Sequence, residues 1–253
     1  MYPTHYKQST PSTNILARDM AEADAVHGTG VIASYQTAGR GRLGKEWHSE
    51  KGKGLYCSII VRPPLKIEDY PKITLTAGVA VSQALDFLTG SVAQLKWPND
   101  IYYQGKKCGG ILTESSALNV HLHKRYAIVG IGININNILA DFPSELQENV
   151  TSLALVTGHE FEIPRVFERI RQQLLLQLDL FCERGFSHIL NIWRQKDFLL
   201  GKRMRCVSTD KKIIEGIALG PDEDGLLHVE DRHGMIHQVL SGDVRLAAEN
   251  EGS

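Results

Sequence analysis

The sequence predicts an α+β fold in which a larger domain, built from helices and a mixed β-sheet, is followed by a small β domain. Up to about residue 196, stretches with helical spacing of apolar residues alternate with short apolar runs that are typical of strands. From Arg203 onward the chain consists instead of short alternating runs separated by turn signals. We place the boundary at Asp197, so that the predicted domains are residues 1–196 and 197–253.

The first part of the larger domain is expected to alternate between helices and strands. Ser12-Thr13-Asn14 precedes apolar residues at helical spacing, which predicts an N-capped amphipathic helix to about Ala25. A second helix is expected over 71–88, where apolar residues recur near helical spacing. The predicted strands are 31–35, 55–61 and 127–135, with a hairpin over 101–113; the strand 127–135 is almost wholly apolar and should lie centrally.

The rest of the chain is predicted to form two helices and then several strands. A helix over 164–184 has proline at its start, apolar residues at helical spacing and Gly185 as its stop. A further helix should cover 186–198. The runs 204–207, 213–219, 226–229 and 236–240, separated in part by Asp224-Gly225 and His233-Gly234, predict a small β-barrel or β-sandwich.

Composition and charge exclude several classes of protein. The chain has 253 residues and a net charge of −1, with its basic residues spread out, so no nucleic-acid footprint is indicated. The four cysteines include no C-x-x-C pair, which argues against structural zinc and a disulfide framework and favours a reducing compartment. No signal-peptide pattern and no apolar stretch of membrane-spanning length occurs. These observations predict a soluble, cytoplasmic protein.

The most informative motif is the glycine-rich loop from Gln36 to Gly44, which contains Arg40, Gly41 and Arg42. Glycines let backbone N–H groups approach an anion, and arginine adds a permanently charged, forked donor for carboxylate and phosphate oxygens. Such a loop suits a carboxylate and a phosphate held side by side, as activation of a carboxylic acid by ATP requires. A dinucleotide fingerprint is disfavoured because the loop leads to a second glycine-rich stretch and a strand, whereas that fingerprint opens a helix. An exposed turn is the other alternative.

Four further segments carry polar residues with both a functional and an ordinary interpretation. In Lys96-Trp97-Pro98-Asn99-Asp100, two polar residues follow a proline, and on its own this pattern most simply predicts a turn. Lys107, before Gly109-Gly110, would on its own most often be solvated. Asn134 lies in an apolar strand, where a polar side chain either faces solvent or has a specific partner. Ser12-Thr13-Asn14 commonly caps a helix, and a helix N-terminus also offers free N–H groups.

In this order and at these distances the motifs resemble those of the biotin protein ligase family, clearly from Ser12 to Asn134 and more loosely beyond. The resemblance implies a catalytic domain like those of class II aminoacyl-tRNA synthetases and biotin synthetases, with a C-terminal SH3-like β-barrel. It implies ATP-dependent ligation of biotin to a lysine of a biotin carboxyl carrier protein through biotinyl-5′-AMP, with ATP and Mg²⁺ required. The implied partner is the carrier domain of a biotin-dependent carboxylase; neither nucleic acid nor a membrane is expected, and a homodimer is left open.

The resemblance also implies a role for each motif residue. Arg40, Arg42 and Lys107 would neutralise charge during catalysis, and Asp100 would hold Mg²⁺. The implied biotin contacts are Ser12, Thr13, Asn14, Gln36, Arg40, Gly41, Arg42, Lys107 and Gly109, and the implied nucleotide contacts are Lys96, Trp97, Asn99, Asp100 and Asn134.

Two other functions fit parts of the sequence. A lipoate ligase or octanoyltransferase belongs to the same superfamily, but those families carry a different arginine- and glycine-rich motif. A biotin-sensing transcriptional regulator would need an N-terminal helix-turn-helix domain, and only about eleven residues precede Ser12. The residue that covers adenine is unassigned, because the segment 138–155 contains no tryptophan.

Overall fold

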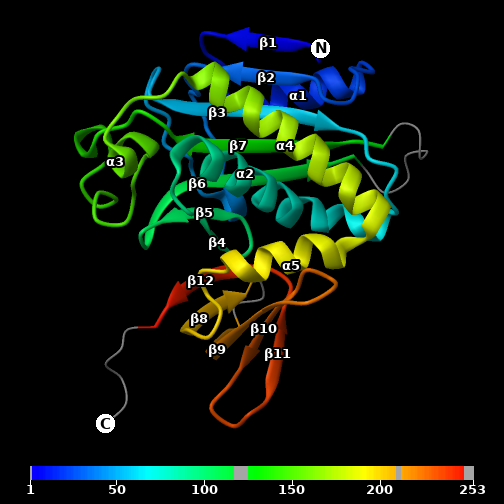
Figure 1. Ribbon diagram of the computed structural model, residues 1–253, viewed down its shortest axis with the longest axis vertical. Helices are drawn as coiled ribbons and strands as arrows, with labels where there is room; N and C mark the ends of the chain where they lie inside the picture. Colours follow the sequence, from blue (N-terminus) through cyan, green and yellow to red (C-terminus); the bar gives the residue numbers. More distant parts are fainter. Residues whose placement is uncertain (1, 117–124, 209–211, 248–253) are drawn as a thin grey trace.

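The computed structural model describes residues 2–116, 125–208 and 212–247 (Figure 1). The strands before the long helices are β1 Thr4–Lys7, β2 Gly30–Ala33, β3 Gly54–Val61, β4 Gln94–Lys96, β5 Asp100–Tyr103, β6 Lys106–Ser115 and β7 Ala127–Asn134. The α-helices are α1 Thr13–Glu22, α2 Ile73–Thr89, α3 Leu153–Thr157, α4 Ile163–Arg184 and α5 Phe186–Lys196, with short 3₁₀ helices η1 Arg42–Gly44, η2 Ile67–Lys72 and η4 Leu139–Asp141. Within these described residues, no helix is both long and apolar enough to span a membrane.

The larger sheet has seven strands in the order β1-β2-β3-β7-β6-β5-β4, with β7 in the middle. Strand β1 runs parallel to β2, and every other neighbouring pair is antiparallel. Every residue of β3 is buried, as is nearly every residue of β7. Strands covered on both faces need apolar residues at consecutive positions rather than at alternate ones, which explains their almost continuous apolar sequences. The predicted central position of strand 127–135 is therefore confirmed.

Helices cover the two faces of this sheet unequally. Helices α2 and α4 pack on one face and form the main core with alternate residues of the strands, such as Leu55 and Val129 (Figure 1). Helix α1 lies on the other face, where Ala17 and Ala21 belong to a smaller cluster with Ile60 of β3. Because α1 is short, part of that second face is left for the site described below.

The C-terminal sheet packs directly against the larger part of the molecule. Its core side, which includes Met204, Cys206 and Ala218, belongs to the same hydrophobic cluster as the larger sheet, and Trp97 Nε1 donates to the carbonyl of Gly225 at 3.0 Å. The two sheets therefore share one core, and the domain boundary at Asp197 stays a prediction. The five strands are β8 Arg203–Ser208, β9 Ile213–Pro221, β10 Leu227–Glu230, β11 Ile236–Val239 and β12 Gly242–Leu246, in the order β11-β10-β9-β8-β12.

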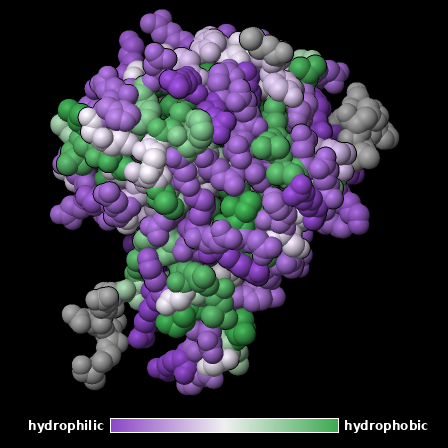
Figure 2. Space-filling model, viewed as in Figure 1, coloured by the Kyte–Doolittle hydropathy of each residue, from purple (hydrophilic) through white to green (hydrophobic). Residues whose placement is uncertain are grey.

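The outer side of this sheet is partly apolar. Along β9, exposed and buried residues alternate, and Ile213, Ile217 and Leu219 are among the exposed ones. Figure 2 shows apolar surface gathered over the C-terminal sheet. The alternation confirms the period-two pattern that predicted strands here.

Some predicted elements have different limits in the structure. The first helix ends at Glu22 rather than near Ala25, because Asp24 adopts a left-handed backbone conformation (φ 62°) that a helix cannot continue through. The helix predicted over 71–88 is α2, which begins at Ile73 because Pro71 belongs to the preceding η2. Strands β1 and β12 and helix α3 were not predicted.

Candidate functional site

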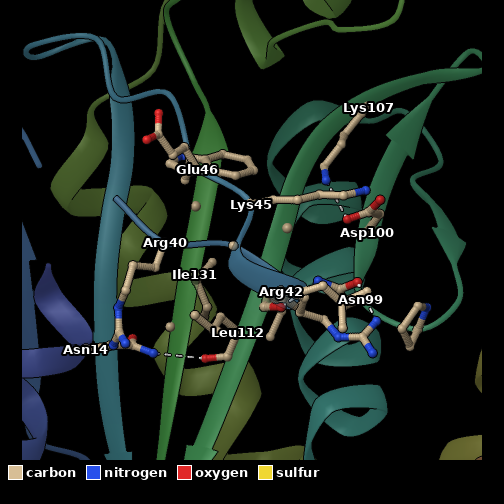
Figure 3. Close-up of a pocket in the computed structure, with 18 of the residues that line it drawn as sticks. Asn14, Arg40, Arg42, Lys45, Glu46, Asn99, Asp100, Lys107, Leu112 and Ile131 are labelled. Atoms are coloured by element: carbon tan, nitrogen blue, oxygen red, sulfur yellow. Dashed lines mark hydrogen bonds and ion pairs between the residues drawn. The ribbon is translucent and has the colours of Figure 1, made fainter. Parts of the chain in front are cut away.

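A cavity of about 170 Å³ lies on the face of the larger sheet that carries α1. Its walls come from the N-terminus of α1, the glycine-rich loop, the segment 96–100, strands β6 and β7, and the beginning of β12. Figure 3 shows residues of all of these segments except β12. Segments far apart in the sequence therefore meet around one space.

Three glycines of β6 and β7, Gly110, Gly130 and Gly132, line the floor of the cavity. A larger residue would not fit at Gly130 or Gly132, because side chains from other elements occupy the space that its Cβ would need. A Cβ at Gly130 would lie 2.1 Å from Asn14 Oδ1, and one at Gly132 would lie 2.5 Å from the Trp47 ring. Gly110 of β6 is paired with Gly132 of β7. Two bare strands at this position let the Trp47 ring rest on the backbone of the sheet.

The start of α1 is tied to the glycine-rich loop. Gln36 Oε1 accepts hydrogen bonds from the Thr13 backbone N–H at 2.9 Å and from Thr13 Oγ1 at 3.2 Å. Ser12 has the extended backbone of an N-cap, but its side chain makes no capping bond, which corrects the predicted N-cap. The Ser58 hydroxyl of β3 lies 2.6 Å from Asn14 Oδ1 and 2.8 Å from Thr13 Oγ1. One end of the cavity thus carries uncharged donors and acceptors held by a common network.

The glycine-rich loop closes on itself before it reaches β3. The Gly41 N–H donates to the carbonyl of Lys45 at 2.7 Å, and Leu43 has a left-handed backbone conformation with φ 55°. The loop contains only the short η1 and opens no α-helix. This geometry agrees with the rejection of a dinucleotide fingerprint, whose glycines lead directly into a helix.

Two cations of this loop contact the C-terminal sheet. Arg42 Nη2 donates to Ser241 Oγ at 2.8 Å, and Lys45 Nζ pairs with Asp243 at 2.8 Å. Arg42 Nη1 also donates to Asn99 Oδ1 at 3.4 Å (Figure 3). Burial lowers the pKa of Arg42, while the hydrogen bond from Lys45 lowers the pKa of Asp243. The C-terminal sheet therefore forms part of the wall and holds the loop over the cavity.

We expect that replacing Asp243 with asparagine will loosen this loop without unfolding the protein. The Lys45–Asp243 pair is partly exposed, so its loss should change the free energy of unfolding by only about 0.2–1 kcal/mol. Limited digestion with trypsin should then cut after Arg40, Arg42 or Lys45 several-fold faster than in the parent. Glu215→Gln, which weakens the exposed Arg205–Glu215 pair of the same sheet, is the matched control. Equal cleavage rates in both variants would mean that Asp243 does not restrain the loop.

Lys107 and Asp100 form an ion pair on the wall opposite α1. Their side chains are 2.6 Å apart (Figure 3). Lys107 Nζ lies 5.6 Å from the centre of the Trp47 ring. Lys107 is one-third exposed, so it is a paired cavity residue rather than a solvated lysine. Burial lowers the pKa of the neighbouring Lys96, which donates to the Tyr102 hydroxyl at 3.2 Å. The charged residues that line this end are the cations Arg42, Lys45, Lys96 and Lys107 and the carboxylates Asp100 and Asp243, so positive charge is in excess here.

Asp100 is the predicted contact for Mg²⁺. Among the described residues, no group of three or more His, Cys, Asp or Glu side chains is arranged to hold a metal ion. A single carboxylate beside a cationic pocket nevertheless fits the usual way in which Mg²⁺ is bound, through one or two carboxylates and the phosphates of a substrate. The residues present thus suit a metal ion that arrives with a nucleotide.

The structure brings most of the predicted site residues together. Gly109 and Asn134 are not part of the cavity wall. A Cβ at Gly109 would lie 2.4 Å from Ile133 Cδ1, and Asn134 Nδ2 donates to the carbonyl of Thr151 at 2.9 Å. Their predicted contacts with biotin and nucleotide stay predictions. The predicted residues that line the cavity are Ser12, Thr13, Asn14, Gln36, Arg40, Gly41, Arg42, Lys96, Trp97, Asn99, Asp100 and Lys107.

Several residues around the cavity were not identified from the sequence. Trp47 lines the cavity and lies three residues after the glycine-rich loop. An aromatic residue so close to that motif is the sequence feature that could have identified it. Ser241 and Asp243 come from the C-terminal sheet, and Glu114 holds Arg40 from outside the cavity. These three contacts join residues about 70 to 200 positions apart, and no local pattern marks them.

The sequence matches the pattern of the biotin/lipoate A/B protein ligase family over residues 6–134. Among curated proteins, the chain is 37% identical over 241 residues to the bifunctional ligase/repressor BirA of Bacillus subtilis, covering 95% of this chain and 73% of that protein. It is 29% identical to the biotin--[acetyl-CoA-carboxylase] ligase of Mycobacterium tuberculosis, covering 93% of this chain and 85% of that protein.

A solved structure has the same fold over nearly the whole chain. The biotin protein ligase from Aquifex aeolicus in complex with biotin and ATP superposes with a TM-score of 0.83 and 30% sequence identity. The match covers 98% of this chain and 100% of that one. The predicted fold class, a mixed α+β domain with a C-terminal antiparallel sheet, is confirmed.

Proposed function

The chain belongs to the biotin/lipoate A/B protein ligase family, and we propose that the cavity between α1 and β12 is where it joins biotin to ATP. The protein is an ATP-dependent biotin ligase. The carboxylate of biotin attacks the α-phosphorus of ATP, which gives biotinyl-5′-AMP and pyrophosphate. The ε-amine of a lysine then attacks the acyl carbon, AMP leaves, and the amine loses a proton as the amide forms. The observation that carries the assignment is a single cavity with an uncharged polar end and a cationic end.

Biotin's ring system would occupy the uncharged end. Its cyclic urea has two N–H donors and one carbonyl acceptor, and it needs neutral partners of both kinds. Ser12, Thr13, Asn14 and Gln36 offer these groups within one connected network. The Trp47 ring, lying on bare backbone, supports an apolar contact for the rest of the bicycle.

The carboxylate and the phosphates would meet at the cationic end. Bringing two anions together is the main electrostatic obstacle in the first step, and positioned cations lower it. Arg42 and Lys107 would stabilise the charge between carboxylate and α-phosphate, with Lys96 adding to the positive field. Asn99, Asp100 and Trp97 would contact the nucleotide, and Asp100 would also contact the Mg²⁺ that accompanies ATP.

The reaction needs no side-chain nucleophile, because the substrates supply both. The protein instead has to orient them and to exclude water, since an acyl-adenylate hydrolyses. The glycine-rich loop is suited to this, because it is tied to α1 through Gln36 and to the C-terminal sheet through Arg42 and Lys45. A loop held at both ends can cover the intermediate and still move to admit the acceptor lysine.

Biotin protein ligases act on the carrier domains of biotin-dependent carboxylases, and we propose such a domain as the acceptor for this protein. Incubation with ATP, Mg²⁺, biotin and a biotin carboxyl carrier domain should attach biotin to one lysine of that domain. Mass spectrometry of the carrier measures the product, and a carrier with its acceptor lysine replaced by arginine is the control. Transfer of lipoate but not of biotin would overturn the assignment.

A further inference from the structure

Glu114 on β6 accepts hydrogen bonds from three side chains, although it does not line the cavity. Its Oε1 pairs with Arg18 at 2.7 Å. Its Oε2 accepts from Asn14 Nδ2 at 2.7 Å and from Arg40 Nη2 at 3.0 Å. An ionised carboxylate has acceptor sites for all three donors and donates nothing itself. Glu114 therefore connects α1, β6 and the glycine-rich loop at one point.

This carboxylate determines which way the Asn14 amide faces. Asn14 Nδ2 also donates to the carbonyl of Leu112 at 3.2 Å, and its Oδ1 lies 2.6 Å from the Ser58 hydroxyl. The reversed amide would place Oδ1 beside the negative oxygens of Glu114 and the carbonyl of Leu112, which is unfavourable. Glu114 thus fixes the donor and acceptor directions of a residue that does line the cavity.

The same carboxylate, which also pairs with Arg18, offsets part of the positive charge of Arg40. Arg40 lies near Asn14 at the uncharged end of the cavity, whereas Arg42 and Lys107 lie toward the other end (Figure 3). An unpaired guanidinium at the uncharged end would attract an anion there. Paired with Glu114, Arg40 offers less attraction, and the anionic part of a substrate is directed to Arg42 and Lys107.

We propose that Glu114 is a positioning residue for biotin: it orients Asn14 and Arg40 at the ring end and offsets positive charge there, without touching the substrate. This inference rests on the proposed function of the cavity. Glu114, a residue outside the cavity wall, would thus help to determine how biotin is oriented within the cavity.

Glu114→Gln tests the proposal, because glutamine keeps the size of the side chain and removes its charge. The KM for biotin should rise about tenfold, as expected when hydrogen bonds to a charged group are weakened, while the KM for Mg-ATP changes less than twofold. ATP–pyrophosphate exchange measures both constants. Glu22→Gln is the matched control, since Glu22 is a carboxylate of α1 that accepts a hydrogen bond from Tyr126, away from the cavity.

Arg40→Gln and the double variant Arg40→Gln/Glu114→Gln distinguish a positioning role of Glu114 from a general loss of structure. If Glu114 acts partly through Arg40, the Arg40→Gln change should raise the KM for biotin less in the Glu114→Gln background than in the parent. Independent effects of the two changes, or equal rises in both KM values with a large drop in melting temperature, would overturn the proposal. Failure of biotin to stimulate ATP–pyrophosphate exchange by the parent protein would contradict the proposed function itself. A parent with biotin-dependent exchange and an unchanged Glu114→Gln variant would contradict the role of Glu114 alone.

Discussion

Replacing Lys107 with alanine is expected to slow formation of biotinyl-5′-AMP by about ten- to a hundredfold, at about 1.4 kcal/mol for each factor of ten. Lys107 lies on the cavity wall, and its ammonium group lies 2.6 Å from Asp100. Its loss removes a positive charge from the place where a carboxylate and a phosphate must approach each other. It also leaves Asp100 without its partner, which adds a negative charge that opposes the same approach. Both effects act on the rate of the first step.

Pyrophosphate release with biotin and Mg-ATP alone is the appropriate measurement, because it requires no acceptor protein. Lys106→Ala is the matched control, since Lys106 is the preceding residue on β6 but is exposed and lies outside the cavity wall. Thermal melting should show little change in either variant, because Lys107 is one-third exposed and contributes little to the core. A Lys107→Ala rate within twofold of the parent would mean that Lys107, although it lies on the cavity wall, does not assist the first step.

The elements predicted best from the sequence are those with strong local signals. Strand β7 is nearly all apolar, and helix α4 combines proline at its start, helical spacing and Gly185 at its end. Strands β1 and β12 gave no such signal, because both are edge strands: β1 is mostly exposed, and β12 has only two apolar side chains, Val244 and Leu246. Their positions depend on partners elsewhere in the chain, which a local pattern does not contain.

The same distinction applies to the site. The motif residues from Ser12 to Lys107 meet around one cavity, because each lies at a strand end, at a helix start or in the loop between them. Successive residues of a strand face opposite sides of the sheet, so Gly110 lines the cavity and Gly109 does not, and the predicted contact of Gly109 with biotin stays a prediction. Glu114 and Asp243 act through contacts with Arg40 and Lys45 that only the folded chain creates.

Replacing Arg42 with alanine is expected to release the acyl-adenylate prematurely. The Arg42 guanidinium bonds to Ser241 and Asn99, so it connects the glycine-rich loop to the C-terminal sheet and to the segment beside β5. Its loss removes both connections together with a positive charge at the cationic end of the cavity. Because interactions of charged groups in such sites are typically about 1.5–3 kcal/mol each, retention of biotinyl-5′-AMP should fall by at least tenfold and the KM for biotin should rise.

Escape of biotinyl-5′-AMP can be told from a simple loss of activity, because the escaped intermediate labels other proteins. Free biotinyl-5′-AMP reacts with lysines on any nearby protein, so the Arg42→Ala variant should label bystander proteins that the parent leaves unlabelled. Rapid filtration of enzyme loaded with labelled biotin measures retention, and blotting of an added bystander protein measures escape. Arg205→Ala, which removes an exposed arginine of β8 outside the cavity wall, is the control for loss of a positive charge. Retention and biotin affinity equal to those of the parent would place Arg42 outside the reaction.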